Sequence, residues 1–145
     1  SKKPIQINEL IEEEVKAIRY KSIPVRTNYD PLKPEIQGDS QLLSMAVRNL
    51  LSNAIEAIPE QGTISVETRR INQQTIIKIT DTGTGIDPDR LGKIFRPFFS
   101  MKTQGHGLGL AMVKKAVILH QGKIEVESEK GIGSQFTITL PDLAG

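Results

Sequence analysis

The chain has 145 residues, enough for one globular domain, and 37% apolar and 25% charged residues are typical of a soluble protein. It has no cysteine and only two histidines, which excludes disulfide frameworks, thiolate metal sites and cysteine nucleophiles and argues against a multi-histidine metal cage. Charges of both signs are scattered to a net +2, unlike the basic patch of a nucleic-acid-binding protein, and no apolar run approaches the roughly 18 residues of a membrane span.

The first part of the chain predicts two helices separated by a strand. Residues 8–20 carry apolar side chains at helical spacing, and Asn8 is a residue type that favours the N-cap position. Residues 23–29 alternate as a short strand, and the turn-rich residues 31–38 connect it to a second helix. This helix, at residues 39–58, has the clearest pattern in the chain, because its apolar side chains recur every three or four positions along one face.

The remainder of the chain predicts two hairpins and one more long helix. A short helix begins at Asp87, and the long helix is apolar nearly all round, so we expect it to be well buried. The predicted strands are 63–70, 75–80, 123–128 and 134–140, and the long helix spans 108–121. This order predicts an α+β fold: a single domain over residues 1–145, with two layers, a mixed and mostly antiparallel sheet, and about three helices on one face.

Two asparagines in the second helix are candidate functional residues. Asn49 and Asn53 lie four residues apart and therefore share one face, at the edge of the apolar stripe. Asparagine is a poor residue for a helix interior because its amide competes for backbone hydrogen bonds. Two readings stay open at this point: the pair is solvated or satisfied in the core, or both side chains point into a shared cavity.

Two glycine-rich segments form a second set of candidates. Asp81 follows an apolar strand directly, and Gly83 and Gly85 after it would let the backbone approach a ligand closely. Residues 105–110 open the long helix, where free N–H groups and the helix dipole favour an anion, and Gly109 inside the helix is costly unless something must come close. The spacing fits neither a P-loop, nor the dinucleotide fingerprint, nor the glycine-rich loop of eukaryotic-type protein kinases.

The connection between these segments predicts a lid, at about residues 86–107. It contains three of the four phenylalanines of the chain, which are Phe95, Phe98 and Phe99. Clustered aromatic side chains anchor such a segment either to the core or to a partner. Core anchoring is the better reading for Phe95, whereas both stay open for Phe98 and Phe99.

Four segments together resemble the N, G1, F and G2 boxes of the sensor histidine kinases, in the order of that family. The tail at residues 127–136 also resembles its closing hairpin, so the resemblance covers essentially the whole chain. It implies the Bergerat ATP-binding fold, shared with gyrase, mismatch-repair and heat-shock-chaperone ATPases. The four segments are Asn49-Leu50-Leu51-Ser52-Asn53-Ala54, Asp81-x-Gly83-x-Gly85-Ile86, Phe95-Arg96-Pro97-Phe98-Phe99 and Gly105-x-Gly107-Leu108-Gly109-Leu110.

The resemblance implies ATP and Mg²⁺ as ligands and assigns roles to individual residues. Asp81 would accept the exocyclic amine of adenine, Asn49 would give its amide oxygen to Mg²⁺, and Asn53 would help to hold the phosphates and metal. Lys102 in the lid is either a mobile phosphate contact or a solvated lysine. The other implied nucleotide contacts are Gly83, Gly85, Ile86, Gly105, His106, Gly107, Leu108 and Gly109.

Three departures from the family pattern affect the expected chemistry. Met45 occupies the position, one turn before Asn49, where hydrolytic relatives place a glutamate, so efficient hydrolysis is not expected. Glu56 stands where many of these kinases have a basic residue. The Asn-Ala-x-Glu-Ala form of residues 53–57 is, however, similar to the nitrogen-regulation branch of the family. His106 replaces the more usual threonine or serine.

The resemblance implies a catalytic domain without its phosphoacceptor. His106 lies in the phosphate cradle, and His120 at a helix end is expected to be solvated. The acceptor would be a histidine on a separate dimerisation domain of the same kinase, with a cognate response regulator served indirectly. The domain would be cytoplasmic, part of a longer protein, without direct contact to nucleic acid or membrane.

The alternatives are a serine/threonine kinase of the anti-sigma type, a nucleotide-gated interaction module and a hydrolytic ATPase. Retention of an acidic residue at position 45 would have favoured the first. Nucleotide binding without transfer to any histidine would favour the second, and steady turnover without an acceptor would favour the third.

Overall fold

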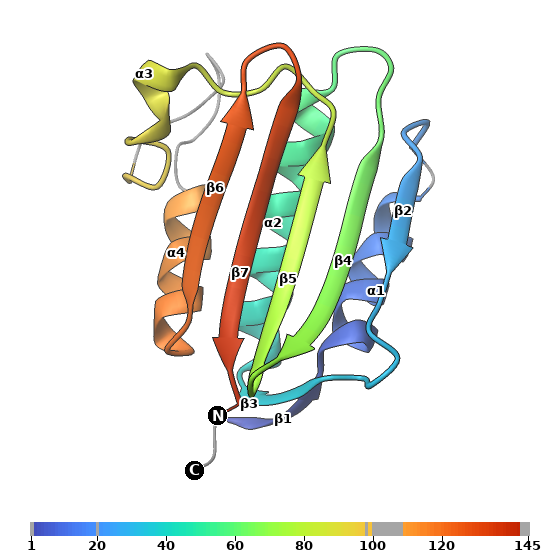
Figure 1. The fold of residues 1–145 in the computed structure, drawn as a ribbon, viewed down its shortest axis with the longest axis vertical. Coiled ribbons are helices and arrows are strands. Elements are labelled where there is room, and N and C mark those ends of the chain that lie inside the picture. Colours follow the sequence, from blue (N-terminus) through green and yellow to red (C-terminus); the bar gives the residue numbers. More distant parts are fainter. Residues whose placement is uncertain (1, 20, 98, 100–108, 143–145) are drawn as a thin grey trace.

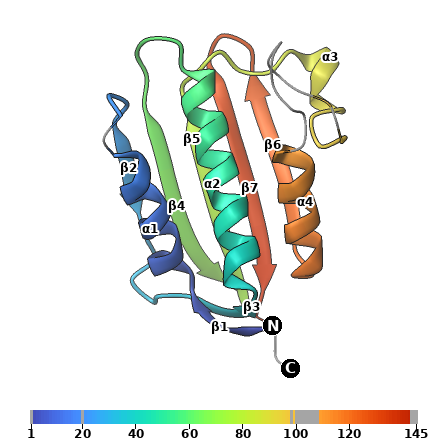
Figure 2. The same ribbon diagram turned by 180° about the vertical axis from the view of Figure 1, so that it is seen from behind.

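A five-stranded sheet with helices on one face is the main feature of the structure, a computed structural model that describes residues 2–19, 21–97, 99 and 109–142. The strand order is β2-β4-β5-β7-β6; β2 is parallel to β4, and the other neighbouring pairs are antiparallel. The strands are β2 (Val25–Asn28), β4 (Ile64–Ile71), β5 (Gln74–Asp81), β6 (Lys123–Glu129) and β7 (Gly133–Pro141). The helices on its covered face are α1 (Ile7–Ile18), α2 (Ser40–Ala57) and α4 (Gly109–Leu119) (Figures 1 and 2). The predicted two-layer α+β fold is confirmed.

Three short elements complete the described part of the chain. The predicted helix after Asp87 is α3 (Pro88–Leu91), with Asp87 as its N-cap. The strands β1 (Lys3–Gln6) and β3 (Glu35–Gly38) pair antiparallel and lie near one end of the main sheet (Figure 1). The expectation of a mere connection over residues 31–38 is therefore wrong, since four-residue strands are too short for an alternating pattern to identify them.

The long helix α2 begins and ends almost where its sequence predicts. Asp39 is the N-cap, and its Oδ1 accepts hydrogen bonds from the backbone N–H groups of Gln41 and Leu42 at 3.0 and 3.1 Å. The predicted apolar stripe faces the sheet, where Leu50 is 1% exposed. Because the cap and the stripe agree, both the register and the orientation of this helix are fixed.

The predicted N-cap of the first helix is wrong. Gln6 caps α1, and Asn8 lies within its first turn. The Asn8 amide instead donates to the Asp30 carbonyl at 2.9 Å and accepts from the Thr68 hydroxyl at 2.7 Å. The asparagine therefore has partners far away in sequence, which no local pattern reveals.

The core fills the space between the sheet and the helices. Its largest fully buried side chains include aliphatic residues from both the helices and the sheet, which are Ile11, Leu50, Leu51, Ile64, Ile79, Ile138 and Leu140. The predicted hairpin joins β4 to β5 through Asn72 and Gln73, which both have the left-handed φ values (53° and 63°) that a two-residue hairpin turn requires.

The expectation that the last long helix is well buried is wrong for its outer side. Met112, Ile118 and Leu119 on α4 are 42%, 57% and 52% exposed. This helix packs between α2 and the edge strand β6, so nothing in the described structure covers its outer side. None of the helices within the described residues is long and apolar enough to cross a membrane.

Candidate functional site

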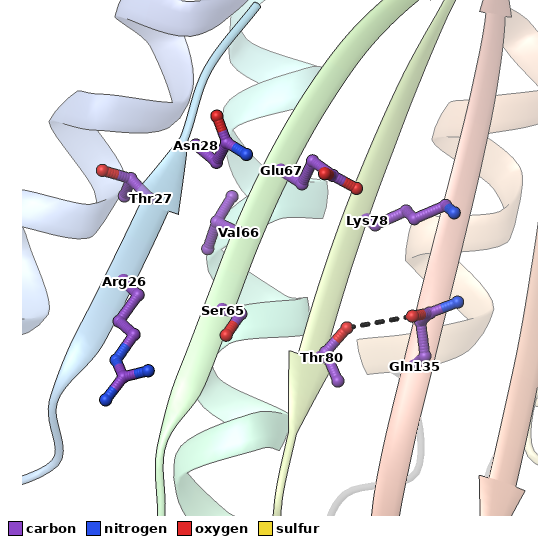
Figure 3. Close-up of a pocket in the computed structure, with 9 residues that line it drawn as sticks. All are labelled: Arg26, Thr27, Asn28, Ser65, Val66, Glu67, Lys78, Thr80 and Gln135. Carbon is purple, nitrogen blue, oxygen red and sulfur yellow. Dashed lines mark hydrogen bonds between the residues drawn. The ribbon is translucent and has the colours of Figure 1, made fainter.

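The alternation of β5 places Asp81 on the helix-covered side of the sheet. Successive side chains of a strand point to opposite faces, and Thr80 lies on the open face, where its hydroxyl is 3.2 Å from Gln135 Oε1 (Figure 3). Asp81 is therefore only 5% exposed, at the end of the strand. Its Oδ1 accepts the Gly83 N–H at 2.8 Å, and the Ser134 N–H also lies beside the carboxylate.

The environment of Asp81 is suited to accepting a hydrogen bond from a ligand. Burial raises the pKa of the Asp81 carboxyl, although the N–H groups of Gly83 and Ser134 oppose this effect. A buried carboxylate with two backbone donors still has acceptor capacity left. The amine of an adenine ring would supply such a donor.

Of the two asparagines of α2, Asn49 lies near the start of α4. Asn49 and Asn53 are both half-buried. A Cβ atom added to Gly109, the first residue of α4, would lie 4.0 Å from the Cγ atom of Asn49. The Asn49 side-chain nitrogen donates to the Met45 sulfur at 3.2 Å, which leaves its Oδ1 atom for another partner. The structure therefore brings the first predicted motif next to the end of the phosphate cradle.

The glycines after Asp81 are required by contacts within the protein itself. A Cβ at Gly83 would lie 2.4 Å from the carbonyl oxygen of Ala57 at the end of α2, and Gly85 has a left-handed φ of 74°. The neighbouring Thr84 N–H donates to the Ala57 carbonyl at 2.9 Å. The segment 81–86 is thereby attached to α2, the helix that carries both asparagines. Direct contact of these glycines with a nucleotide stays a prediction.

The described part of the predicted lid is anchored to the core. Ile94 is buried, and the ring of Phe95 meets Phe136 edge to face with centroids 6.3 Å apart. The Lys114 ammonium lies 5.7 Å from the centroid of the Phe95 ring, and Phe99 also packs against the core. Core anchoring of Phe95 is thus confirmed, and for Phe99, where both readings were open, the structure shows packing against the core. Phe98, Lys102, Gly105, His106, Gly107 and Leu108 lie outside the described residues.

The expectation of a solvated His120 is wrong. The side chain is 2% exposed; its Nε2 accepts the Asp39 N–H at 2.9 Å, and its Nδ1 lies 2.7 Å from the Ala116 carbonyl oxygen. The acceptor role of Nε2 implies that Nδ1 carries the proton and donates to Ala116. Gly38 makes room for the ring, because a Cβ there would lie 2.6 Å from it.

Sequence reasoning missed one polar residue beside the site, Ser128. Its hydroxyl accepts the Ile86 N–H at 2.7 Å, at the end of the segment that Asp81 begins. In the sequence, Ser128 could be noticed only as a member of the predicted closing hairpin. Its contact with Ile86 becomes visible only once the register of two strand pairs is known.

A separate pocket of about 270 Å³ lies on the open face of the sheet. It is lined by polar side chains such as Arg26 and Lys78 (Figure 3), and this face is opposite to the one on which Asp81 lies.

Comparison with known proteins identifies the family. Residues 38–144 match the histidine kinase-, DNA gyrase B-, and HSP90-like ATPase family. The chain belongs to this family. It is 31% identical to the catalytic domain of the histidine kinase ThkA in a nucleotide-free form, with a TM-score of 0.86, and the match covers 98% of this chain and 96% of that one. The mycobacterial sensor histidine kinase MprB is also 31% identical, with a TM-score of 0.87 over 97% of both chains.

Full-length relatives are much longer than this chain. It is 39% identical to the sensor histidine kinase ZraS of Salmonella typhimurium, over 97% of this chain but 31% of ZraS. It is 37% identical to the histidine-protein kinase AtoS of Escherichia coli, over 94% of this chain and 23% of AtoS. The chain therefore spans about a third or less of these relatives and corresponds to an ATP-binding catalytic domain of the sensor histidine kinase type.

Proposed function

We propose that the domain binds Mg·ATP between α2, the start of α4 and the segment 81–86, and transfers the γ-phosphoryl group to a histidine on a separate dimerisation domain of the same kinase. The observation that carries this proposal is the buried Asp81 carboxylate, which begins a segment attached to α2, the helix whose Asn49 lies near the first residue of α4. A structural neighbour, full-length ShkA, was solved in complex with AMPPNP; it is 26% identical to this chain, with a TM-score of 0.86.

The residues of the site have the chemistry that the nucleotide requires. Asp81 accepts the adenine amine, and the N–H groups at the start of α4 face the phosphates. Asn49 holds Mg²⁺ through its amide oxygen, a hard ligand of the kind that this ion prefers, while Asn53 assists from the next turn. When bound, the ion neutralises charge on the phosphates. Lys102, His106 and the cradle glycines complete the phosphate contacts.

Transfer fits the site better than hydrolysis. The side chain in contact with Asn49 is the thioether of Met45, which cannot remove a proton from water. With no base in that place, the domain positions the γ-phosphoryl group and stabilises its charge, as phosphoryl transfer mainly requires. The nucleophile must then be supplied from elsewhere.

His120 is not available as that nucleophile. Both of its ring nitrogens have hydrogen-bond partners in the core. His106 stands in the predicted phosphate cradle, so we assign the acceptor histidine to another domain, from which a response regulator takes the phosphoryl group. Because ATP is the substrate, this function places the domain in the cytoplasm, whether or not the parent kinase is anchored in a membrane.

The test is a transfer assay with γ-labelled ATP, this chain and the isolated dimerisation domain of the parent kinase. We expect label on that domain that is acid-labile and base-stable, as for phosphohistidine. Acid-stable label on serine or threonine, or steady release of phosphate without an acceptor, would replace the proposal by one of the other enzymes. Nucleotide binding without any transfer would indicate an interaction module.

A further inference from the structure

The hairpin between β6 and β7 holds the segment 81–86 at both ends. At its start, Asp81 is the cross-strand partner of Ser134 on β7, whose N–H lies beside the Asp81 carboxylate. At its end, the Ile86 N–H donates to the hydroxyl of Ser128 at 2.7 Å. Ser128 lies on β6 and is in turn the cross-strand partner of Ser134 on β7. A path of hydrogen bonds thus runs from Ile86 through Ser128 to Ser134, the residue paired with Asp81.

The hydroxyl of Ser128 has three hydrogen-bond partners, which occupy its one donor and two acceptor positions. Besides the Ile86 N–H, it lies 3.0 Å from the Gly133 carbonyl oxygen and 2.8 Å from the Ser134 hydroxyl. A serine hydroxyl has one donor and two acceptor positions. It therefore donates to Gly133 and accepts from both Ile86 and Ser134, so no alternative orientation satisfies all three groups.

Close packing in the same place leaves the segment no room to adjust. A Cβ at Gly85 would lie 2.2 Å from the Glu129 carbonyl oxygen, and one at Gly133 would lie 2.0 Å from that of Asp81. The Gly131 N–H also donates to the Thr84 carbonyl at 2.7 Å. The position of the segment therefore depends on the hairpin, and Ser128 is the side chain that joins the two.

We propose that Ser128 is a positioning residue for nucleotide binding, whose hydroxyl fixes the end of segment 81–86 and thereby the place of the Asp81 carboxylate relative to the purine. This inference rests on the proposed role of Asp81. Ser128 itself contacts no ligand in this scheme. A supporting residue of this kind acts by keeping the binding group within a few tenths of an ångström of its productive place.

Ser128→Ala tests the proposal through affinity. We expect about tenfold weaker binding of both ADP and AMPPNP, measured by titration calorimetry with Mg²⁺ present, because a buried N–H loses its partner and the loop shifts. The transfer rate at saturating ATP should stay within about twofold of the wild type, since the phosphate contacts are unchanged. Ser128→Thr retains the hydroxyl and should restore the affinity.

Thr68→Val is the matched control for a purely structural effect. The Thr68 hydroxyl is buried on β4 and also has two partners, the Asp30 N–H and the Asn8 amide oxygen. The substitution Thr68→Val should lower the melting temperature without changing nucleotide affinity. If Ser128→Ala behaves in the same way, the proposal is overturned. Should Ser128→Ala not fold, Ser128→Cys replaces the hydroxyl by a thiol, a weak acceptor for the Ile86 N–H, and unchanged affinity in that variant would equally overturn the proposal.

Asp81→Asn separates this proposal from the one on which it rests. If the wild-type domain binds neither nucleotide, the proposed function fails. If the wild type binds and Asp81→Asn weakens binding while Ser128→Ala does not, only the role of Ser128 fails.

Discussion

At the residue scale, three N–H donors would meet on Asp81 once adenine is bound. Two come from Gly83 and Ser134, and the third is the adenine amine. An amide has only one acceptor oxygen, so in Asp81→Asn the NH₂ group must face one of these donors. We expect ATP and ADP affinities to fall together, by about tenfold or more, because both carry the same base.

The measurement is calorimetric titration with each nucleotide, together with thermal unfolding. Because burial raises the pKa of Asp81, its ionised form destabilises the fold at neutral pH relative to the protonated form. The uncharged asparagine removes this cost, so the melting temperature should not fall. Loss of ATP binding with ADP binding retained would contradict the assigned role of Asp81.

The second prediction at this scale concerns Asn49. Asn49→Ala removes the amide oxygen that would ligate Mg²⁺, and we expect the transfer rate to fall by about 100-fold because charge on the phosphates is no longer neutralised in place. Binding of ADP without Mg²⁺ should change by less than about threefold, since the base is held by Asp81. Comparing single-turnover transfer with metal-free ADP titration separates the two effects. Normal transfer kinetics would show that Asn49 is not a metal ligand.

The candidate site could be predicted where neighbours in sequence share a function. Asn49 and Asp81 stand in recognisable local patterns, and the fold places Gly109 beside Asn49. Ser128 and His120 could not be interpreted locally, because one partner of each, Ile86 and Asp39 respectively, lies more than 40 residues away in sequence. Their roles depend on strand register and on the packing of one helix end against another.

At the scale of elements, predictability followed length and amphipathicity. The 18-residue helix α2 has both a cap and an apolar stripe, and its bounds were found to within a residue. The four-residue strands β1 and β3 have neither, and they were missed. For α4, the apolar composition gave the correct helix but the wrong exposure, since composition does not show that a helix packs at the edge of a sheet.

The junction between α4 and α2 yields the third prediction. His120 at the end of α4 joins the Ala116 carbonyl to the Asp39 N–H, at the N-cap of α2. His120→Phe keeps the ring but leaves a buried N–H unpaired, which costs about 2 kcal/mol and should lower the melting temperature by about 5 °C. Leu119→Ala, at an adjacent exposed position, is the control and should have little effect. Equal melting temperatures for the wild type and His120→Phe would show that this junction does not stabilise the fold.

At the scale of the whole molecule, aspartates that accept backbone N–H groups make the stability of the fold depend on pH. The pKa of Asp30 lies below its ordinary value of 3.8, because the N–H groups of Leu32 and Arg70 donate to its carboxylate. The N–H groups of Leu42 and Gln41 lower the pKa of Asp39 in the same way. A lowered folded-state pKa means that the carboxylate stabilises the fold above the unfolded pKa, and that this contribution is lost as pH falls toward the folded value.

The last prediction is therefore a dependence of stability on acid that Asp30 helps to set. Asp30 Oδ1 accepts the Leu32 N–H at 2.9 Å and Oδ2 accepts the Arg70 N–H at 2.8 Å, whereas an asparagine would turn its NH₂ group toward one of these donors. We expect Asp30→Asn to lower the melting temperature at pH 7 and to reduce its further fall as the pH drops below about 4. The measurement is thermal unfolding followed by circular dichroism at each pH, with the exposed Asp89→Asn as control. The Asp30→Asn variant has no carboxylate at this position, so acid cannot remove the Asp30 contribution from it. If its melting temperature nevertheless falls with acid as steeply as that of the wild type, the acid sensitivity belongs to other carboxylates.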